Sequence, residues 1–268
     1  MEITSKDVVY KSGNEEIHSY ISYPNDSNKY PGVILIHEIF GLDDHIKDVT
    51  RRLAKEGYVV LAPDLFSSES LSKILTPLAI SKTMKFMMSI PIEKQRDENY
   101  RNQEMAKLSQ EEQTAIYGVY KTFFIDRPVD KFVDYLSDGL EYILHQNNVN
   151  GKIGSVGFCF GGSMSINLAC KGKVDASVIF YGENPEPINK VKGVKNAVLG
   201  IYGGEDVRIT SKVPELVKEL SEHKKNISVN IYSGAHHAFF NDTRPQMHNE
   251  KASISAWKLL LNFYKEYL

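Results

Sequence analysis

Apolar residues along the chain fall into two alternating patterns. One is a short continuous run rich in β-branched side chains, as in Gly32–His37 and Tyr58–Ala62, which is typical of a strand buried on both faces. The other places an apolar residue at every third or fourth position, which is typical of a helix with one buried face. A helical stripe from Leu42 to Leu53 separates the two runs, and Gly57 follows it where a helix C-cap is expected.

The same alternation returns in the second half of the chain. Further strand-like runs occur at Lys152–Phe158, Ala176–Tyr181, Ala197–Tyr202 and Ile227–Tyr232, and helical stripes at 129–143, 213–220 and 254–264. Strands that alternate with helices predict an α/β fold with a mostly parallel central sheet and helices on both faces. The runs Val8–Tyr10 and Ile17–Tyr23 alternate apolar and polar residues, which favours an antiparallel edge at the N-terminus.

The segment between Phe66 and Arg127 has a different composition. It is rich in methionine at first, strongly charged from Glu93 to Glu112, and then aromatic. A loop of this length without secondary structure would be unusual, so we expect a helical insertion at about residues 67–127. Two interpretations stay open: the insertion covers core, or it forms a cap that shapes a substrate pocket. Without repeats or a linker, we expect residues 1–268 to form a single domain.

Composition excludes several classes of function. The chain is 42% hydrophobic and 25% charged, with a net charge of −2, so it lacks the positive field that nucleic-acid binding requires. Met1–Glu16 does not resemble a signal peptide, and no run approaches the ~18 apolar residues of a membrane span. We therefore expect a cytoplasmic protein. Two cysteines are too few for a disulfide framework, and neither has the CxxC spacing of a structural zinc site.

One motif carries the chemistry. Gly157-Phe-Cys-Phe-Gly-Gly162 stands where a predicted strand ends and a helix must begin, which is the setting of the nucleophile elbow, here with cysteine in place of serine. The tight turn requires small residues on both sides. It places Cys159 at a helix N-terminus, where free N–H groups favour a thiolate. We interpret Cys159 as a nucleophile rather than a small buried side chain, and Cys170, which has no such frame, as core.

A base and an orienting acid are expected after the nucleophile, in the order acid and then histidine. Asp206 follows a predicted strand and is our choice of acid over Glu205, although a helix-capping role is the alternative. His236 and His237 follow the last predicted strand. We choose His237 as the general base and His236 as its neighbour. Adjacent side chains diverge, so the pair does not predict a metal site.

The segment His37-Glu-Ile-Phe-Gly41 follows the first predicted parallel strand, where such enzymes place a donor of the oxyanion hole. We assign the backbone N–H groups of Ile39 and Phe160 to that hole. Glu38 stands at the edge of the sheet where ligands bind and could hold the Cys159 thiol until substrate arrives. The alternative is a solvated loop acid.

Five segments in register over most of the chain resemble the dienelactone hydrolase family. They are His37–Gly41, Pro63–Phe66, Gly157–Gly162, Gly203–Asp206 and His237–Pro245. The resemblance implies an α/β-hydrolase fold, a triad of Cys159, His237 and Asp206, a Glu38 that governs thiol ionisation, and no metal or organic cofactor. We expect a small-molecule ester or lactone as substrate, no nucleic-acid or membrane partner, and a monomer or small homo-oligomer.

The chain departs from the family at positions that recognise substrate. Ser67-Ser-Glu-Ser70 stands where those enzymes carry an arginine that binds the substrate carboxylate. The position four after the histidine, arginine in those enzymes, is Asn241, and only Arg244 lies nearby in the sequence as a candidate substrate-binding residue. We therefore expect hydrolysis of an ester or lactone through a thioester. The alternatives are a broad carboxylesterase or thioesterase with the same triad, and a non-catalytic redox sensor that uses Cys159.

Overall fold

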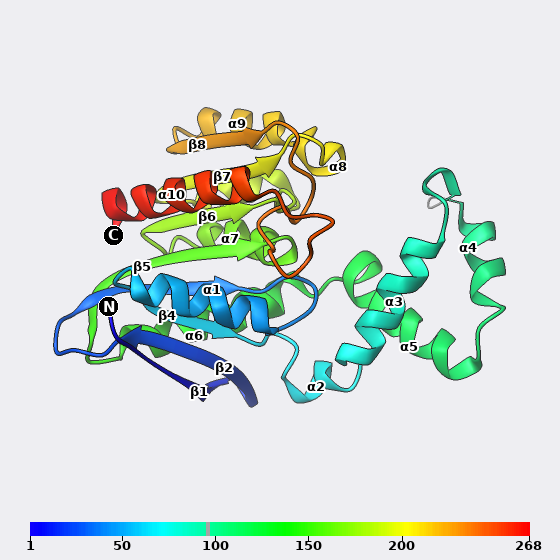
Figure 1. Cartoon of the computed structure of the whole chain (residues 1–268), viewed down its shortest axis with the longest axis horizontal. Helices are drawn as coiled ribbons and strands as arrows, with labels where there is room; N and C mark the ends of the chain where they lie inside the picture. The colour runs from blue at the N-terminus through cyan, green and yellow to red at the C-terminus, as the bar shows by residue number, and fades with distance from the viewer. Residues whose placement is uncertain (95–96) are drawn as a thin grey trace.

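The computed structural model describes residues 1–94 and 97–268. Within these residues, eight strands form one sheet in the order β1-β2-β4-β3-β5-β6-β7-β8 (Figure 1). The strands are β1 (Ile3–Ser12), β2 (Glu15–Pro24), β3 (Tyr30–Ile36), β4 (Val59–Pro63), β5 (Val149–Phe158), β6 (Ala176–Phe180), β7 (Ala197–Gly203) and β8 (Ile227–Tyr232). β2 runs antiparallel to β1 and β4, whereas the remaining neighbours are parallel. The predicted antiparallel edge and parallel centre are confirmed.

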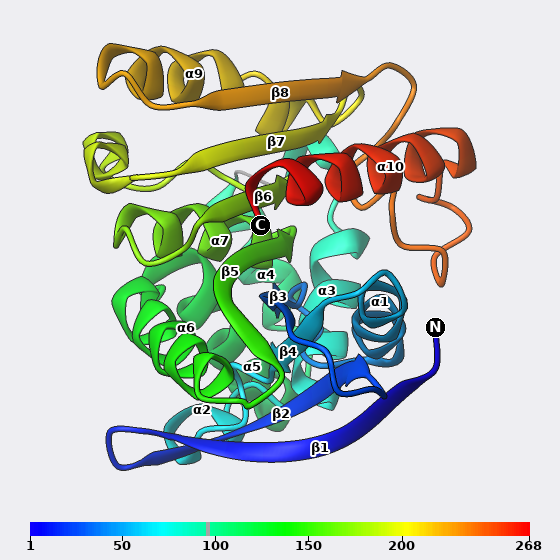
Figure 2. The same ribbon diagram turned by 90° about the vertical axis from the view of Figure 1, so that its left-hand side faces the viewer.

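Helices cover both faces of the sheet (Figure 2). One face carries α1 (Asp44–Lys55) and α10 (Glu250–Tyr267), and the other carries α6 (Val129–Leu144), α7 (Phe160–Cys170) and α9 (Val213–Glu222). Each face has its own hydrophobic core, because the side chains of the doubly buried strands β3 to β7 alternate between the two. The short elements η3 (Ile188–Gly193) and α8 (Val207–Thr210) complete this part of the fold.

The predicted bounds of several strands were wrong by a few residues. β3 starts at Tyr30 and ends before His37, and β5 starts at Val149, ahead of the predicted Lys152. β6 ends at Phe180, because Tyr181 has a φ of +40° and leaves the extended conformation. Strand ends are set by pairing with neighbours rather than by local apolar pattern, so the pattern alone does not locate them.

Residues 67–127 contain helices that project away from the sheet at one end of the molecule (Figure 1). They are α2 (Glu69–Ser72), α3 (Pro77–Ser89), η1 (Ile92–Lys94), α4 (Glu98–Met105), α5 (Gln110–Tyr120) and the π-helical turn η2 (Lys121–Ile125). Phe86, Ile90 and Ile116 form a small core of their own here, separate from the two cores of the sheet. Ser109 and Glu112 form a reciprocal capping box that begins α5.

Among the described residues, none of the helices is both long enough and apolar enough to cross a bilayer.

The turn from β5 into α7 is the tightest backbone contact in the centre of the fold. A Cβ atom added to Gly157 would lie 1.9 Å from the backbone oxygen of Gly161. One added to Gly161 would lie 2.2 Å from the oxygen of Ile36 at the end of β3. The turn holds Cys159 at a φ of +54°, a conformation that costs energy in a non-glycine residue. Only glycine fits at both flanking positions.

The close backbone contact at Gly157 can be tested by measuring the stability of a variant. Gly157→Ala should lower the free energy of unfolding by roughly 1–3 kcal/mol or more, because backbone atoms cannot move aside for the methyl group. Gly118→Ala is the matched control. Its new Cβ meets only the side chain of Ile74, at 3.1 Å, and alanine is favoured over glycine within a helix by up to ~1 kcal/mol. Urea denaturation should rank Gly157→Ala well below both the unaltered chain and Gly118→Ala; equal stability would contradict the steric argument.

Candidate active site

Cys159 lies between β5 and α7, as the elbow motif predicts. Its backbone N–H donates to the oxygen of Phe180 at 3.0 Å, which ties the turn to the end of the neighbouring strand. The side chain is half-buried. Because α7 begins at Phe160, the first N–H groups of that helix have no partner within it and surround the sulfur with partial positive charge.

Asp206 and His237 meet beside this cysteine. Asp206 follows β7, is 8% exposed, and its Oδ2 lies 2.5 Å from Nδ1 of His237, which follows β8. The rival Glu205 is exposed and accepts a hydrogen bond from the Gly234 N–H at 3.2 Å instead, so it ties two loops together. His236 is exposed. The structure therefore pairs Asp206 with His237. The alternatives Glu205 and His236 do not take part in this pair.

The imidazole of His237 has an unusual pKa. Burial acts to lower it, but the charges of Cys159 and Asp206, together with side-chain hydrogen bonds to both, raise the pKa of His237 to about 10. The protonated imidazole is therefore favoured once the Cys159 sulfur is ionised. Once it has received a proton from the thiol, His237 and the Cys159 thiolate stabilise each other as an ion pair.

Glu38 is buried at the same site. Glu38 is 2% exposed, and its Oε2 accepts a hydrogen bond from Nδ2 of Asn241 at 2.6 Å. Burial raises the pKa of Glu38, against the lowering effects of Asn241, His45 and Arg244. The alternative of a solvated loop acid does not fit this position. Asn241, which departs from the family pattern, contacts Glu38.

Asn241 is itself oriented by a neighbour. Its Oδ1 accepts hydrogen bonds from the backbone N–H of Thr243 at 3.1 Å and from the Thr243 hydroxyl at 2.6 Å. With the oxygen so engaged, the amide nitrogen must face Glu38, where it can only donate.

His37 fixes the loop that carries Glu38 and Ile39. Its Nδ1 lies 2.6 Å from the backbone oxygen of Glu38, and its Nε2 accepts from the backbone N–H of Leu65 at 3.0 Å. An imidazole that donates at one nitrogen and accepts at the other is neutral. Burial lowers the pKa of His37, which agrees with that role. The histidine is thus a brace between the loops that follow β3 and β4.

These residues open onto a cavity of about 230 Å³. Glu38, Cys159, Tyr181 and His237 line its polar end. Its apolar walls are Ile39, Phe40, Met84, Phe123, Phe124 and Phe160. Met84, Phe123 and Phe124 come from the helical insertion. The insertion therefore forms one wall of the cavity, in addition to covering part of the core.

Three arginines stand around the cavity, although the sequence pointed only to Arg244. Glu183 binds Arg127 through Oε2 at 2.9 Å and Arg208 through Oε1 at 2.6 Å. The guanidinium carbon of Arg244 lies 3.5 Å from the ring centroid of Phe40. The segments that carry Arg127, Glu183 and Arg208 contain no motif, so only the fold shows that they converge.

Two buried residues near the site were also missed. Tyr181 has a fully buried hydroxyl without a hydrogen-bond partner among the described residues, and its ring centroid lies 5.1 Å from that of His237. Burial, followed by the charges of Glu38 and Cys159, raises the pKa of Tyr181. His45, also buried, places Nδ1 3.3 Å from Oδ1 of Asp242. Tyr181 was the last residue of a predicted strand, which was the available signal for the first; the second had none.

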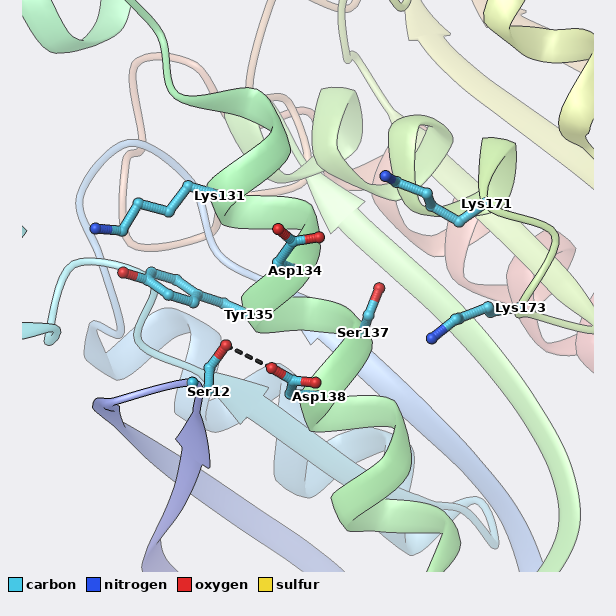
Figure 3. A pocket seen from close by; sticks show the side chains of 9 residues that line it. Ser12, Lys131, Asp134, Tyr135, Ser137, Asp138, Lys171 and Lys173 are labelled. Atoms are coloured by element: carbon cyan, nitrogen blue, oxygen red, sulfur yellow. Dashed lines mark hydrogen bonds between the residues drawn. The ribbon is translucent and has the colours of Figure 1, made fainter.

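A larger hollow elsewhere lacks comparable chemistry. It measures about 510 Å³ and lies between the end of β1, α6 and the end of α7 (Figure 3). Ser12 donates to Oδ2 of Asp138 there at 2.6 Å, and lysines face aspartates across the opening. The residues that line it include no cysteine or histidine. Within the described ranges, no group of three or more histidine, cysteine or acidic side chains is placed to hold a metal ion.

Comparison with known proteins agrees with this geometry. The model of the dienelactone hydrolase family matches residues 17–268. The chain belongs to this family. It is accordingly a hydrolase of the carboxymethylenebutenolidase type with an α/β-hydrolase fold, acting on small molecules.

Several known proteins are similar to this chain over most of its length. The "Putative carboxymethylenebutenolidase" of Saccharolobus solfataricus is 35% identical over 262 residues, which are 97% of this chain and 98% of that protein. The carboxymethylenebutenolidase of Pseudomonas putida is 27% identical over 78% of this chain and 75% of its own. The crystal structure of dienelactone hydrolase from Anabaena variabilis shares the fold, with a TM-score of 0.67, 16% identity and full coverage of both chains.

The two cysteines should differ sharply in reactivity. Burial raises the pKa of Cys170 to about 12, so its thiol stays protonated at neutral pH, whereas Cys159 lines the cavity beside His237. Brief treatment with iodoacetamide at pH 7, followed by peptide mapping, should label Cys159 at least tenfold faster than Cys170. Preferential labelling of Cys170 with activity unaffected would remove the basis for treating Cys159 as the reactive thiol.

Proposed function

We propose that this dienelactone hydrolase cleaves an ester or lactone by acyl transfer through a thioester at Cys159. The observation that carries the proposal is the pairing of His237 with Asp206 at 2.5 Å beside the cysteine that the elbow presents to the cavity. A buried acid that orients a histidine toward a nucleophile is the arrangement that covalent hydrolysis requires.

The proposed reaction has two halves. His237 takes the proton of the Cys159 thiol, and the sulfur attacks the carbonyl carbon of the substrate. The tetrahedral intermediate collapses to a thioester as the alcohol leaves with the proton from His237. Water, deprotonated by His237, then attacks the thioester, and the acid leaves while the thiol regains its proton. Asp206 holds the imidazole in position and stabilises its protonated form throughout.

The oxyanion needs donors at a fixed place. The backbone N–H of Phe160, at the first position of α7, and that of Ile39, on the loop braced by His37, are the proposed donors. Both residues line the cavity beside Cys159. Backbone donors held by the sheet need no reorganisation as charge develops on the carbonyl oxygen, which is why they lower the barrier.

Glu38 is proposed to control the thiol rather than to bind substrate. A carboxylate in a buried site next to Cys159 disfavours a second negative charge on sulfur, while the helix N-terminus and protonated His237 favour it. These opposed effects keep the resting thiol guarded against oxidation. Displacement of Glu38 by substrate removes the repulsion, so that the thiolate forms when an acyl group is present to attack.

The enzymatic proposal is tested with p-nitrophenyl acetate. Cys159→Ala should abolish turnover, and His237→Ala should lower kcat/KM by on the order of 10³-fold or more, as removal of a triad member does. His236→Ala is the matched control, because its exposed side chain lies outside the cavity, and it should lose less than threefold. Equal losses for the two histidines would contradict the choice of base. Reversible oxidation of Cys159 by peroxide without any ester turnover would instead favour the thiol sensor.

Glu38→Gln should change two measurements in opposite directions. Removing the negative charge should speed the alkylation of Cys159 by iodoacetamide without substrate, because the thiolate is no longer repelled, while slowing turnover of p-nitrophenyl acetate. Asn241→Asp, which puts a second carboxylate against Glu38, provides the comparison and should slow alkylation. If Glu38→Gln leaves both rates unchanged, the carboxylate has no part in thiol control.

A further inference from the structure

The catalytic cavity is too small to hold a long substrate. Its volume of about 230 Å³ lies below the roughly 300–1,000 Å³ of most small-molecule sites. One of its walls is Phe124, a large apolar side chain that is nonetheless 51% exposed. A substrate larger than a short ester must therefore extend out of the cavity, and this side of its mouth is apolar.

A second hollow of about 400 Å³ lies within the helical insertion. We name it the outer hollow. Its apolar lining comprises Phe86, Met87, Met105, Tyr117, Tyr120 and Ile125, on α3, α4, α5 and η2. The rest of its lining is polar and comprises Glu98, Arg101, Asn102, Gln110, Gln113 and Thr114. Phe86 also belongs to the small separate core of the insertion. The outer hollow thus borders that small core.

The outer hollow adjoins the catalytic cavity. Phe124 lines the cavity and Tyr120 lines the outer hollow, and their ring centroids lie 5.2 Å apart. The same division recurs on α3, where Met84 faces the cavity and Met87 faces the outer hollow. The same stretches of chain, around η2 and in α3, therefore contribute side chains to both spaces.

Exposed apolar side chains gather at this boundary. Tyr117 and Ile125 of the outer hollow are 59% and 58% exposed, next to the half-exposed Phe124. Large apolar side chains grouped on a surface mark an interaction site. The hollow is of the size that small-molecule sites have, and a specific protein interface would need upwards of ~1,000 Å² of contact. The contact between Tyr120 of the outer hollow and Phe124 of the catalytic cavity favours a part of the substrate as the occupant.

We propose that the outer hollow binds an apolar chain of the acyl group, which passes from the carbonyl at Cys159 over Phe124 and rests on Tyr117, Tyr120 and Ile125. The inference rests on the proposed function, because it assigns another part of the same substrate. It names the substrate class as esters of medium-chain, uncharged acyl groups rather than compact lactones alone.

The first test varies the length of the acyl chain. Full burial of one methylene corresponds to roughly fourfold in affinity, and a partly open hollow gives less. The value of kcat/KM for p-nitrophenyl octanoate, kept below its solubility limit, should exceed that for the acetate by on the order of tenfold or more. A steady fall in kcat/KM from acetate through butyrate to octanoate would overturn the proposal.

The second test removes apolar surface from the outer hollow. Tyr117→Ser and Ile125→Ser alter exposed residues outside the catalytic cavity, so each should lower kcat/KM for the octanoate at least threefold and leave that for the acetate unchanged. Leu78→Ser is the matched control. Leu78 is a 65% exposed residue of α3 that lines neither space, and its replacement should change neither ester. Equal effects of Leu78→Ser and Tyr117→Ser on the octanoate would count against the outer hollow.

A binding measurement separates this inference from the proposed chemistry. N-phenyl-1-naphthylamine, an uncharged apolar fluorophore, should bind Cys159→Ala as well as the unaltered chain, and Tyr117→Ser should weaken its binding at least threefold. Binding with that dependence but no ester turnover by the unaltered chain would mean that the proposed function fails while the apolar site stands. Binding that is absent, or indifferent to Tyr117→Ser, would overturn the outer hollow as a site.

Discussion

The candidate site depends on the close crossing of β5 and α7 at Cys159. Because Gly157 and Gly161 carry no side chains, the turn can press against the end of β3 and hold the cysteine at a φ of +54°. That contact places the first turn of α7 among the ends of β3 and β6. The loops that carry Glu38 and Tyr181 leave those same strand ends, so one steric constraint positions both residues beside the sulfur, whereas Asp206 and His237 follow β7 and β8.

The proposed mechanism depends on groups that favour or oppose a negative charge on the Cys159 sulfur. The elbow offers the sulfur a helix N-terminus and His237 as stabilising neighbours, and the buried carboxylate of Glu38 opposes them. Asn241 holds that carboxylate with a neutral amide at 2.6 Å. In the enzymes that this chain resembles, arginine occupies the position. An amide satisfies Glu38 without adding a positive charge of its own, which suits the proposed repulsion between Glu38 and a thiolate.

Much of the sheet could be predicted because doubly buried parallel strands and amphipathic helices leave strong periodic patterns, as at β3 and α1. Cys159, His237 and Asp206 could be chosen as candidates from the sequence, because the order of catalytic residues in α/β-hydrolases places each of them after a strand. The pattern could not show that Arg127 and Arg208 share Glu183, since these residues lie on three segments that only the fold joins. The apolar pattern also could not decide whether residues 67–127 cover core or shape a pocket, because helices that cover core and helices that line a cavity have similar apolar faces.

The insertion separates selectivity from catalysis. The proposed catalytic groups follow strands of the sheet. Cys159 and Asp206 follow β5 and β7, which are paired on both sides, and His237 follows the edge strand β8, which is paired with β7. Phe124 instead lies on the helical insertion and is 51% exposed, whereas Phe123 is 2% exposed and packs into the core that α6 and α7 share with the sheet. An exposed side chain such as Phe124 can change in size without displacing that core. In the proposed function, this wall therefore helps to select the acyl group that reaches Cys159, while the sheet preserves the geometry that acts on it.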